Sequence, residues 1–414
     1  MKPTSAFTLD NGLRVVHHHD HLTAMVAVNV LYNVGARDES PEMTGLAHLF
    51  EHLMFGGSVN IPEYDSAIER AGGLNNAWTS NDFTNFFDVA PAVNAETLFW
   101  LESVRMLGLA FSEKSLEVQR NVVIEEFKQV CLNKPYGDLS HRLRSMLYTV
   151  HPYRYPTIGK EISHIERVTL DDVKSFFYSH YAPNNAVLAV SGNISAERVR
   201  ELAEKWFGGI PRRDIAPRTY APEPPVESPR SDVMTGRVPQ TAVFVVYPMC
   251  GYTGQDYVPC DLITDILASG RSSRLYRSLV MAGDLFSDAD ASIAGSEEPG
   301  YLMLSGRLLR GGEDAEREAV SRLTAQAEAM VTGGVSAYEL NRAVNRFESN
   351  HTFGNMSFLA VAQSMAMNVM HGEDDDTVMA RYRTVTTADI SRASREVFNP
   401  KRRLTLVYRP ESQI

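Results

Sequence analysis

The chain contains little cysteine, with three in 414 residues: Cys131, Cys250 and Cys260. Their number is odd, they are scattered, and no pair shows the C-x-x-C spacing of a metal or redox site. The sequence therefore predicts neither a disulfide framework nor a thiolate metal site. We interpret the three residues as ordinary thiols of a reducing compartment, where disulfides are rare.

Long apolar runs and an excess of positive charge are also missing. No run approaches the roughly 18 apolar residues that a membrane-spanning helix needs, and residues 1–7 lack the apolar core of a signal peptide. We expect no membrane partner and a cytoplasmic location, or a periplasmic one if a leader has been removed. A net charge of −11 argues against nucleic acid as a partner, because phosphate binding needs clustered basic residues.

Two of the 12 histidines lie four residues apart with a glutamate between them. His48, Glu51 and His52 share one stripe of a helix, since successive residues turn by about 100°. Two neutral imidazoles in this position can share a Zn²⁺ ion while the carboxylate acts as a base on water, which is the inverted form of the H-E-x-x-H pattern. The neighbouring leucines and phenylalanine predict a buried helix, in which unpaired polar groups are costly. The alternative is a helix with surface histidines and a salt-bridging glutamate.

A hydrolytic zinc site usually has three protein ligands, so one more is expected. A downstream segment without Gly or Pro predicts a helix that carries two adjacent glutamates. On a helical wheel Glu126 lies among Val122, Val123 and Val130, whereas Glu125 lies on a more mixed side. A carboxylate on an apolar stripe calls for a cation, so Glu126 is the predicted third ligand and Glu125 a solvated or supporting group.

The histidines at 17–19, followed by His21, are a weaker metal candidate. They come at the end of a predicted strand, 13–17, so we interpret them as a polar turn.

Predicted strands and long helices alternate along the chain, which indicates an α+β fold with helices packed on sheets. The proline-rich segment 214–232 has no apolar periodicity and predicts an extended linker between a first domain, 1–213, and a second, 233–414. The second domain repeats the outline of the first. Its strand at 241–247 corresponds to 25–32, and the helix that follows carries no histidine, so only the first copy has metal ligands.

With these motifs in this order, the chain resembles the pitrilysin/insulinase family of zinc peptidases, the inverzincins. The resemblance extends over most of residues 1–210 and rests on the segments 9–16, 34–39, 48–52, 72–87 and 120–126. It implies two homologous domains, each a mainly antiparallel sheet packed with helices, that form half of a clamshell. It also implies that His48, His52 and Glu126 bind Zn²⁺ and that Glu51 is the general base.

The same resemblance implies that an extended peptide adds as one more strand at an exposed sheet edge, 74–79, through Asn76, Ala77 and Trp78. A turn at the two adjacent asparagines is the alternative. Backbone pairing of this kind predicts weak side-chain specificity and a requirement for short or unfolded peptides.

One part of the family pattern is missing. Relatives often carry an Arg and a Tyr seven residues apart, soon after an S-S-R-L-[FY] sequence. Here that sequence ends at Tyr276, but the expected positions hold Val280 and Ser287. We therefore expect a homodimer, or a heterodimer with a homologous subunit that carries the missing pair, unless other residues serve.

The predicted function is zinc-dependent hydrolysis of peptides or unfolded polypeptide segments. One alternative is a zinc-binding but non-proteolytic or partner-dependent subunit of a processing or scaffold complex. Another is a zinc hydrolase that acts on a non-peptide bond. The intact set of His48, Glu51, His52 and Glu126 favours the peptidase, although Mn²⁺ or Co²⁺ could also fill such a site.

Overall fold

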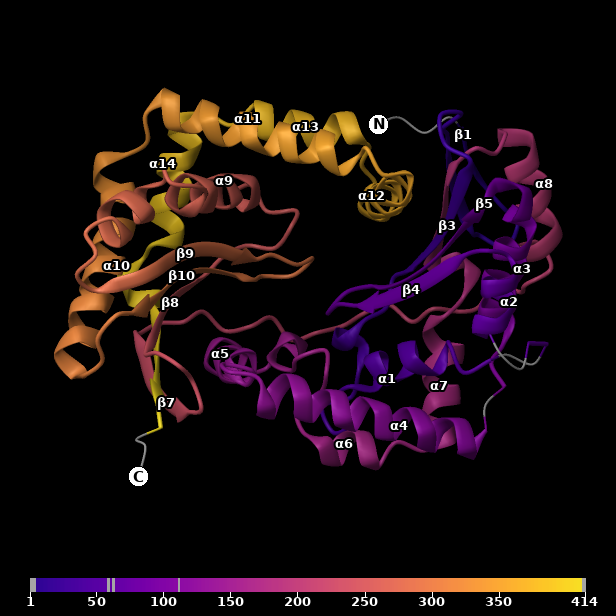
Figure 1. Ribbon diagram of the computed structural model, residues 1–414, viewed down its shortest axis with the longest axis horizontal. Coiled ribbons are helices and arrows are strands. Elements are labelled where there is room, and N and C mark those ends of the chain that lie inside the picture. Colours follow the sequence, from indigo (N-terminus) through magenta and orange to yellow (C-terminus); the bar gives the residue numbers. More distant parts are fainter. Residues whose placement is uncertain (1–4, 58–59, 62–63, 111, 412–414) are drawn as a thin grey trace. The chain divides into compact units, whose positions relative to one another are not determined.

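The computed structural model describes residues 5–57, 60–61, 64–110 and 112–411, which form two compact units (Figure 1). The first unit comprises the chain up to Lys128 together with Tyr155–Ala221 and His351–Val378. The second comprises Gln129–Arg154, Pro222–Asn350 and the chain from Met379 onward. Each unit is built around one β-sheet with helices packed against it.

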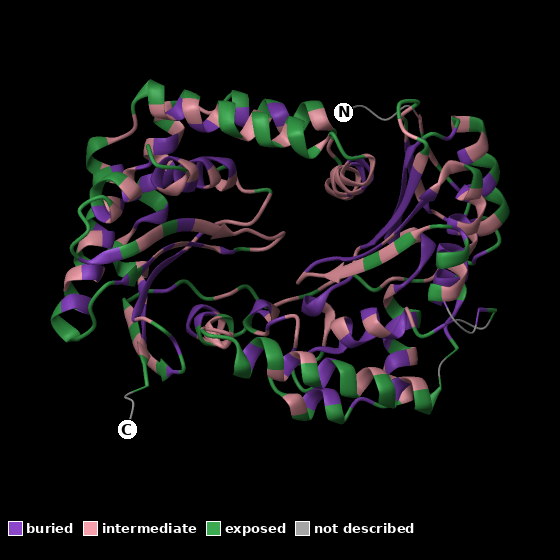
Figure 2. Cartoon of the chain, in the orientation of Figure 1, coloured by how far each residue is buried: buried purple, intermediate pink, exposed green. Residues whose placement is uncertain are grey.

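The first sheet has six strands, which are in spatial order β1 (Ser5–Thr8), β2 (Arg14–His19), β6 (Ala186–Gly192), β3 (Met25–Tyr32), β5 (Thr84–Pro91) and β4 (Leu74–Thr79). All neighbours are antiparallel except β2 and β6, which are parallel. Strands β3 and β6 are buried almost throughout, and β3 is largely purple in Figure 2. A strand covered on both faces needs a continuous apolar run without alternation, and both sequences have one.

The second sheet has five strands, which are in spatial order β7 (Arg230–Gly236), β11 (Leu404–Pro410), β8 (Ala242–Pro248), β10 (Tyr301–Leu308) and β9 (Phe286–Ala294). Here β7 and β11 form the parallel pair, and the other neighbours are antiparallel.

The two sheets share one topology. Strands β7, β11, β8, β10 and β9 follow the same order and the same pattern of directions as β2, β6, β3, β5 and β4. The expected α+β fold of two related, mainly antiparallel sheets packed with helices is therefore confirmed.

Helices cover both faces of the first sheet. Helices α3 and α8 pack on each other and reach β5, β3 and β2, while α12 packs on β3, β6 and β2. Several helices begin at side-chain caps, for example Ser195 before α8 and Thr169 before α7, which satisfy backbone N–H groups of the first turn. The helices of this unit are α1 (Leu46–Leu53), α2 (Tyr64–Arg70), α3 (Ala95–Leu107), α4 (Glu113–Phe127), α6 (Ile162–Glu166), α7 (Leu170–His180), α8 (Ala196–Phe207) and α12 (Phe358–His371).

Around the second sheet, α9 packs on β9 and on α14, and α10 packs on β8, β10 and α14. The remaining helices of the chain are α5 (Leu139–Leu147), α9 (Tyr257–Ala268), α10 (Glu313–Gly333), α11 (Ala337–Gly354), α13 (Asp375–Arg383) and α14 (Thr387–Val397).

Two helices pack in the compact unit that is formed mainly by the other half of the sequence. Helix α12 belongs to the second half, yet its Val361 and Met365 join the core of the first sheet beside Leu31. Helix α5 belongs to the first half, yet its Leu143 packs with Leu406 in the core of the second sheet. The compact units are thus interleaved along the chain, whereas the sequence repeat predicted continuous domains at 1–213 and 233–414.

The interpretation of His17–His19 as a polar turn is wrong. Strand β2 continues through His19 because its parallel pairing with β6 extends to Gly192. His17 is buried, and its Nε2 lies 2.9 Å from the carbonyl oxygen of Ile194. The turn begins only after the strand, at His21.

The proline-rich segment contains no helix or strand between Phe207 and Arg230. Within the described part of the chain, no helix combines the length and apolar character needed to cross a membrane. Residues 1–4, which are part of the segment examined for a leader, lie outside the described residues.

Candidate metal centre

One side of helix α1 is fixed in the core of the first unit. Its apolar positions recur at helical spacing, which gives a stripe of buried side chains: Leu46, Leu49, Phe50 and Leu53. The ring of Phe50 contacts those of Phe177 and Tyr181, with centroids 5.9 and 4.4 Å away. The orientation of α1 is therefore set by packing, which also sets where its polar side chains point.

The N-terminus of α1 is capped by a distant carboxylate. Glu39 accepts hydrogen bonds from the backbone N–H groups of Gly45 and Ala47, at 2.8 and 2.7 Å. Gly45 has φ +88, and a Cβ there would lie 3.0 Å from the carbonyl oxygen of Ile158, so this entry to the helix requires glycine. Burial raises the pKa of Glu39 to about 8, although the two hydrogen bonds oppose that shift.

The C-terminus of α1 meets a buried cation. The Nε of Arg105 in α3 donates to the carbonyl oxygen of Met54, at 3.4 Å. The same guanidinium pairs with Glu102 and lies over the ring of Tyr64, 4.1 Å from its centroid. Tyr64 in turn donates to Asp88 at 2.9 Å. A positive group at a helix C-terminus complements its unpaired carbonyls, so both ends of α1 are held.

His48, His52 and Glu126 converge. The Nε2 atoms of His48 and His52 lie 3.7 and 3.3 Å from Oε2 of Glu126, and one donor atom from each residue lies within 4.8 Å of the other two. Ligand atoms bound to zinc at about 2.0–2.2 Å in a tetrahedron are separated by about 3.3–3.5 Å. The spacing of these side chains therefore fits a metal ion.

The charges of the group fit a cation as well. Burial lowers the pKa of His48 to about 4, which keeps its imidazole neutral and able to donate a lone pair. The contact with His52 lowers the pKa of Glu126, which is therefore ionised at neutral pH. Two imidazoles and one carboxylate are a common ligand set of hydrolytic zinc sites, which leave one position open.

Glu51 is the buried member of the motif, and it faces strand β4. The hydroxyl of Thr79, at the end of β4, donates to its Oε2. Burial raises the pKa of the Glu51 carboxyl, and the hydrogen bond from Thr79 acts in the opposite direction. A carboxylate with a raised pKa beside a metal-ligand group is suited to accept a proton and return it near neutral pH.

The structure brings Glu126 to the histidines and leaves Glu125 outside. Glu125 is exposed and pairs with Lys128 at 2.6 Å. The predicted apolar stripe around Glu126 is only partly covered, because Val122 and Val130 are 45% and 39% exposed. The buried neighbours that orient this face of α4 are Val123 and Phe127.

The predicted substrate residues lie on strand β4, and the alternative of a turn at the asparagines is wrong. Among the described strands, β4 pairs only with β5, so it is an edge strand (Figure 1). Asn76, Ala77 and Trp78 pair with Phe87, Phe86 and Asn85 in the ladder. The backbone N–H of Ala77 also donates to the side-chain Oδ1 of Asn76, at 2.8 Å.

Three residues that shape the centre had no signal in the sequence: Glu39, Thr79 and Arg105. Glu39 bonds to the start of α1 from a few residues upstream, whereas Thr79 bonds to Glu51 from 28 residues downstream and Arg105 bonds to Met54, which follows α1, from 51 residues downstream. Glu39 and Thr79 lie within the segments 34–39 and 72–87 that carry the family resemblance, but neither was predicted as a site residue. In the second unit, Val280 ends a single π-helical turn, Tyr276–Val280, and Ser287 lies on β9.

The chain is similar in sequence and in fold to known proteins. Two models of one family match the chain, described as "Insulinase (Peptidase family M16)" over residues 14–161 and "Peptidase M16 inactive domain" over residues 167–347. The zinc protease PqqE of Helicobacter pylori is 29% identical over 97% of this chain and 92% of its own length. An uncharacterized zinc protease of Bacillus subtilis, YmxG, is 30% identical over 52% of this chain and 53% of its own.

A solved structure of a protease from Helicobacter pylori matches with a TM-score of 0.91 and 27% identity, covering 99% of this chain and all of that one (100%). The two family models together cover more than half of the chain, in the order of its two related sheets. The resemblance seen in the motifs is thereby confirmed, and the chain belongs to the M16 family of peptidases, which includes insulinase and pitrilysin.

Proposed function

We propose that the chain is a zinc-dependent endopeptidase that hydrolyses peptides or unfolded polypeptide segments. His48, His52 and Glu126 hold the metal, and Glu51 is the general base. The observation that carries this proposal is the convergence of the three donor atoms beside a buried carboxylate that is hydrogen-bonded to an edge strand.

The residues divide the chemistry among them. A bound zinc ion would polarise the scissile carbonyl and make water a better nucleophile near neutral pH. Glu51 accepts the proton of the attacking water and later passes it to the leaving amine, for which its raised pKa is suited. Thr79 holds the Glu51 carboxylate in one orientation while the proton moves.

Substrate binding falls to β4. An extended peptide adds to its open edge, and the Ala77 N–H, now engaged by the Asn76 side chain, becomes available when that side chain turns away. Asn76, Ala77 and Trp78 provide the contacts. Pairing through the backbone selects for unfolded segments rather than for one side chain.

The absence of an Arg/Tyr pair at Val280 and Ser287 supports dependence on a second chain. We propose that the protein works as a homodimer or as a heterodimer with a homologous subunit that carries this pair. The second candidate function, a partner-dependent subunit of a processing complex, rests on the same observation. The proposed cytoplasmic location rests on the sequence alone.

The test is cleavage of a quenched-fluorescent peptide library by the purified chain, with and without chelator. We expect cleavage that chelator abolishes and zinc restores, and a loss of at least about 1,000-fold in Glu51→Gln. Undiminished cleavage by Glu51→Gln would overturn the assigned role of this residue. If the chain alone is inactive, the assay is repeated with proteins that co-purify with it from its native cell, and inactivity in that preparation would contradict the peptidase.

A further inference from the structure

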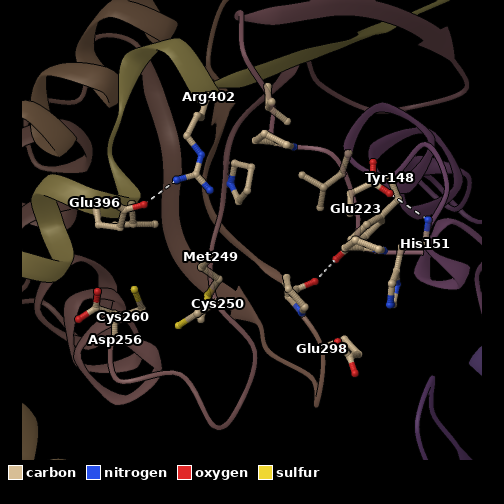
Figure 3. A pocket seen from close by; sticks show the side chains of 18 of the residues that line it. Tyr148, His151, Glu223, Met249, Cys250, Asp256, Cys260, Glu298, Glu396 and Arg402 are labelled. Carbon is tan, nitrogen blue, oxygen red and sulfur yellow. Dashed lines mark hydrogen bonds and ion pairs between the residues drawn. The ribbon is translucent and has the colours of Figure 1, made fainter. Parts of the chain in front are cut away.

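The second unit contains a cavity of about 400 Å³ that plays no part in the metal centre (Figure 3). It is lined from four directions: by the chain around Tyr148, the proline-rich segment, the end of β8, and the C-terminal part of α14. All of its lining residues belong to the second unit. The volume lies within the range of about 300–1,000 Å³ in which proteins bind small organic molecules.

The walls are apolar and preformed. Prolines supply much of the surface, and a proline ring cannot change its backbone φ. The proline-rich wall is also tied down, because Glu223 accepts hydrogen bonds from the backbone N–H groups of Thr149, Val150 and His151 at 2.7–3.0 Å. On another side, the hydroxyl of Tyr148 donates to the carbonyl oxygen of Pro299, at 2.8 Å. A ligand would therefore find the cavity already open, which lowers the entropy cost of binding.

One lining cation has unused donor capacity. Arg402 donates from Nη1 to Glu396 at 2.7 Å, while its Nη2 has no hydrogen-bond partner among the described residues and points into the cavity in Figure 3. The bond to Glu396 is no obstacle, because that carboxylate is 68% exposed and exposed ion pairs contribute little.

Apart from Glu396, the acidic lining residues are bonded to other groups or lie away from Arg402. Both oxygens of Glu223 are already occupied by the backbone of 149–151. Asp256 is held by Arg392, at 2.8 Å. Glu298 lies on the opposite side of the cavity from Arg402 in Figure 3. A bound molecule thus meets apolar walls along its body and, at one end, the Arg402 guanidinium with its partner Glu396.

We propose that this cavity binds a small carboxylate with an apolar body, and that the Arg402 guanidinium receives the carboxylate. Two kinds of molecule share this chemistry: a medium-chain fatty acid, and an apolar amino-acid residue with a free C-terminal carboxylate. The proposal does not depend on peptidase activity, because the cavity and the metal centre use different residues.

Cys250 provides a direct readout of occupancy. It lines the cavity and is partly exposed, whereas Cys131 and Cys260 are buried. We would treat the full-length chain with N-ethylmaleimide and follow each cysteine by peptide mass spectrometry. Decanoate, below its micelle-forming concentration, and N-acetylphenylalanine represent the two kinds of ligand. We expect one or both to slow alkylation of Cys250 by at least about tenfold at saturation.

The matched neutral compounds are decanol and N-acetylphenylalaninamide. They should protect only at concentrations about tenfold higher, because they lack the charge that Arg402 receives. The carboxylate that protects identifies the kind of ligand. Absence of protection by both carboxylates, or equal protection by the neutral compounds, would overturn the proposal.

Two arginine variants test whether Arg402 receives the carboxylate. Arg402→Gln should raise the half-protecting concentration of the carboxylate about tenfold and leave that of its neutral analogue unchanged. Arg403→Gln is the control, because Arg403 has the same charge and does not line the cavity. Equal effects of the two substitutions would contradict the role of Arg402. If circular dichroism shows that Arg402→Gln does not fold, the comparison of charged and neutral compounds on the wild-type chain still tests the proposal.

Discussion

The hydroxyl of Thr79 on strand β4 donates a hydrogen bond to Oε2 of Glu51 on helix α1. This bond joins the strand proposed to hold substrate to the carboxylate proposed to move the proton. We predict that Thr79→Val lowers kcat by about 10- to 100-fold with little change in KM, because a hydrogen bond to a charged group contributes about 1.5–3 kcal/mol. Steady-state kinetics on a quenched peptide measures both constants.

Thr79→Ser keeps the hydroxyl and is the matched control, so its kcat should stay within a few-fold of wild type. If Thr79→Ser loses as much activity as Thr79→Val, or if Thr79→Val keeps the activity of wild type, the hydrogen bond to Glu51 is not the cause.

Substitution of Glu126 should weaken zinc binding much more than substitution of the adjacent Glu125. Glu126→Gln removes a charged donor that lies 3.3 Å from Nε2 of His52, and we predict a loss of zinc affinity of about 100-fold or more. Glu125→Gln removes a charge from the same helix, but its exposed partner is Lys128, so affinity should change less than about twofold. Competition with a chromophoric chelator gives both dissociation constants. Similar losses in the two variants would mean that general electrostatics, and not ligation, dominates.

The cap of α1 should make stability depend on pH. Burial raises the pKa of Glu39 from its ordinary value of 4.5 to about 8. The contribution of Glu39 to the free energy of unfolding is therefore fully present below pH 4.5 and is lost as the pH rises towards 8. We predict that stability falls less between about pH 5 and 8.5 in Glu39→Gln than in wild type.

Urea unfolding at the two pH values measures this difference, and Glu125→Gln controls for the loss of one carboxylate. An identical pH dependence in wild type and Glu39→Gln would show that Glu39 keeps the same charge in the folded and unfolded chain.

Two arginines with the same helical spacing to an acid should differ in their effect on stability. Arg105 and its partner Glu102 are buried, with side chains 1% and 0% exposed. Arg105→Met leaves an uncompensated buried carboxylate and should cost about 3–5 kcal/mol. Arg317 and Asp314 are 68% and 94% exposed, and Arg317→Met should leave the unfolding midpoint unchanged. Equal midpoints for the two variants would contradict a stabilising role of the buried pair.

The sequence alone predicted those features that depend on the spacing of nearby residues. The spacing of His48, Glu51 and His52 follows from helix geometry alone, and the strand 25–32 coincides with β3 because a buried strand is a continuous apolar run. The prediction of Glu126 as a ligand assumed that its apolar neighbours on the helix are buried. Val123 is buried, but Val122 is exposed. Periodicity reports which residues share a face and does not report which face is covered.

Contacts between distant residues could not be predicted in this way. The bond of Thr79 to Glu51 and the packing of α12 on β3 depend on tertiary arrangement and leave no period in the sequence. The extension of β2 through His19 also depends on a distant segment. Pairing with β6 outweighs the polar composition of three consecutive histidines.

Because α5 and α12 each pack in the core formed mainly by the other half of the sequence, the two halves depend on each other to fold. A chain that ended in the linker before β7 would lack Val361 and Met365, which complete the core of the first sheet. A chain that began there would lack Leu143 and its neighbours in the core of the second. Neither half is then a self-sufficient folding unit, and a protease that cuts the linker of the native protein should leave two fragments that remain together until denaturant separates them.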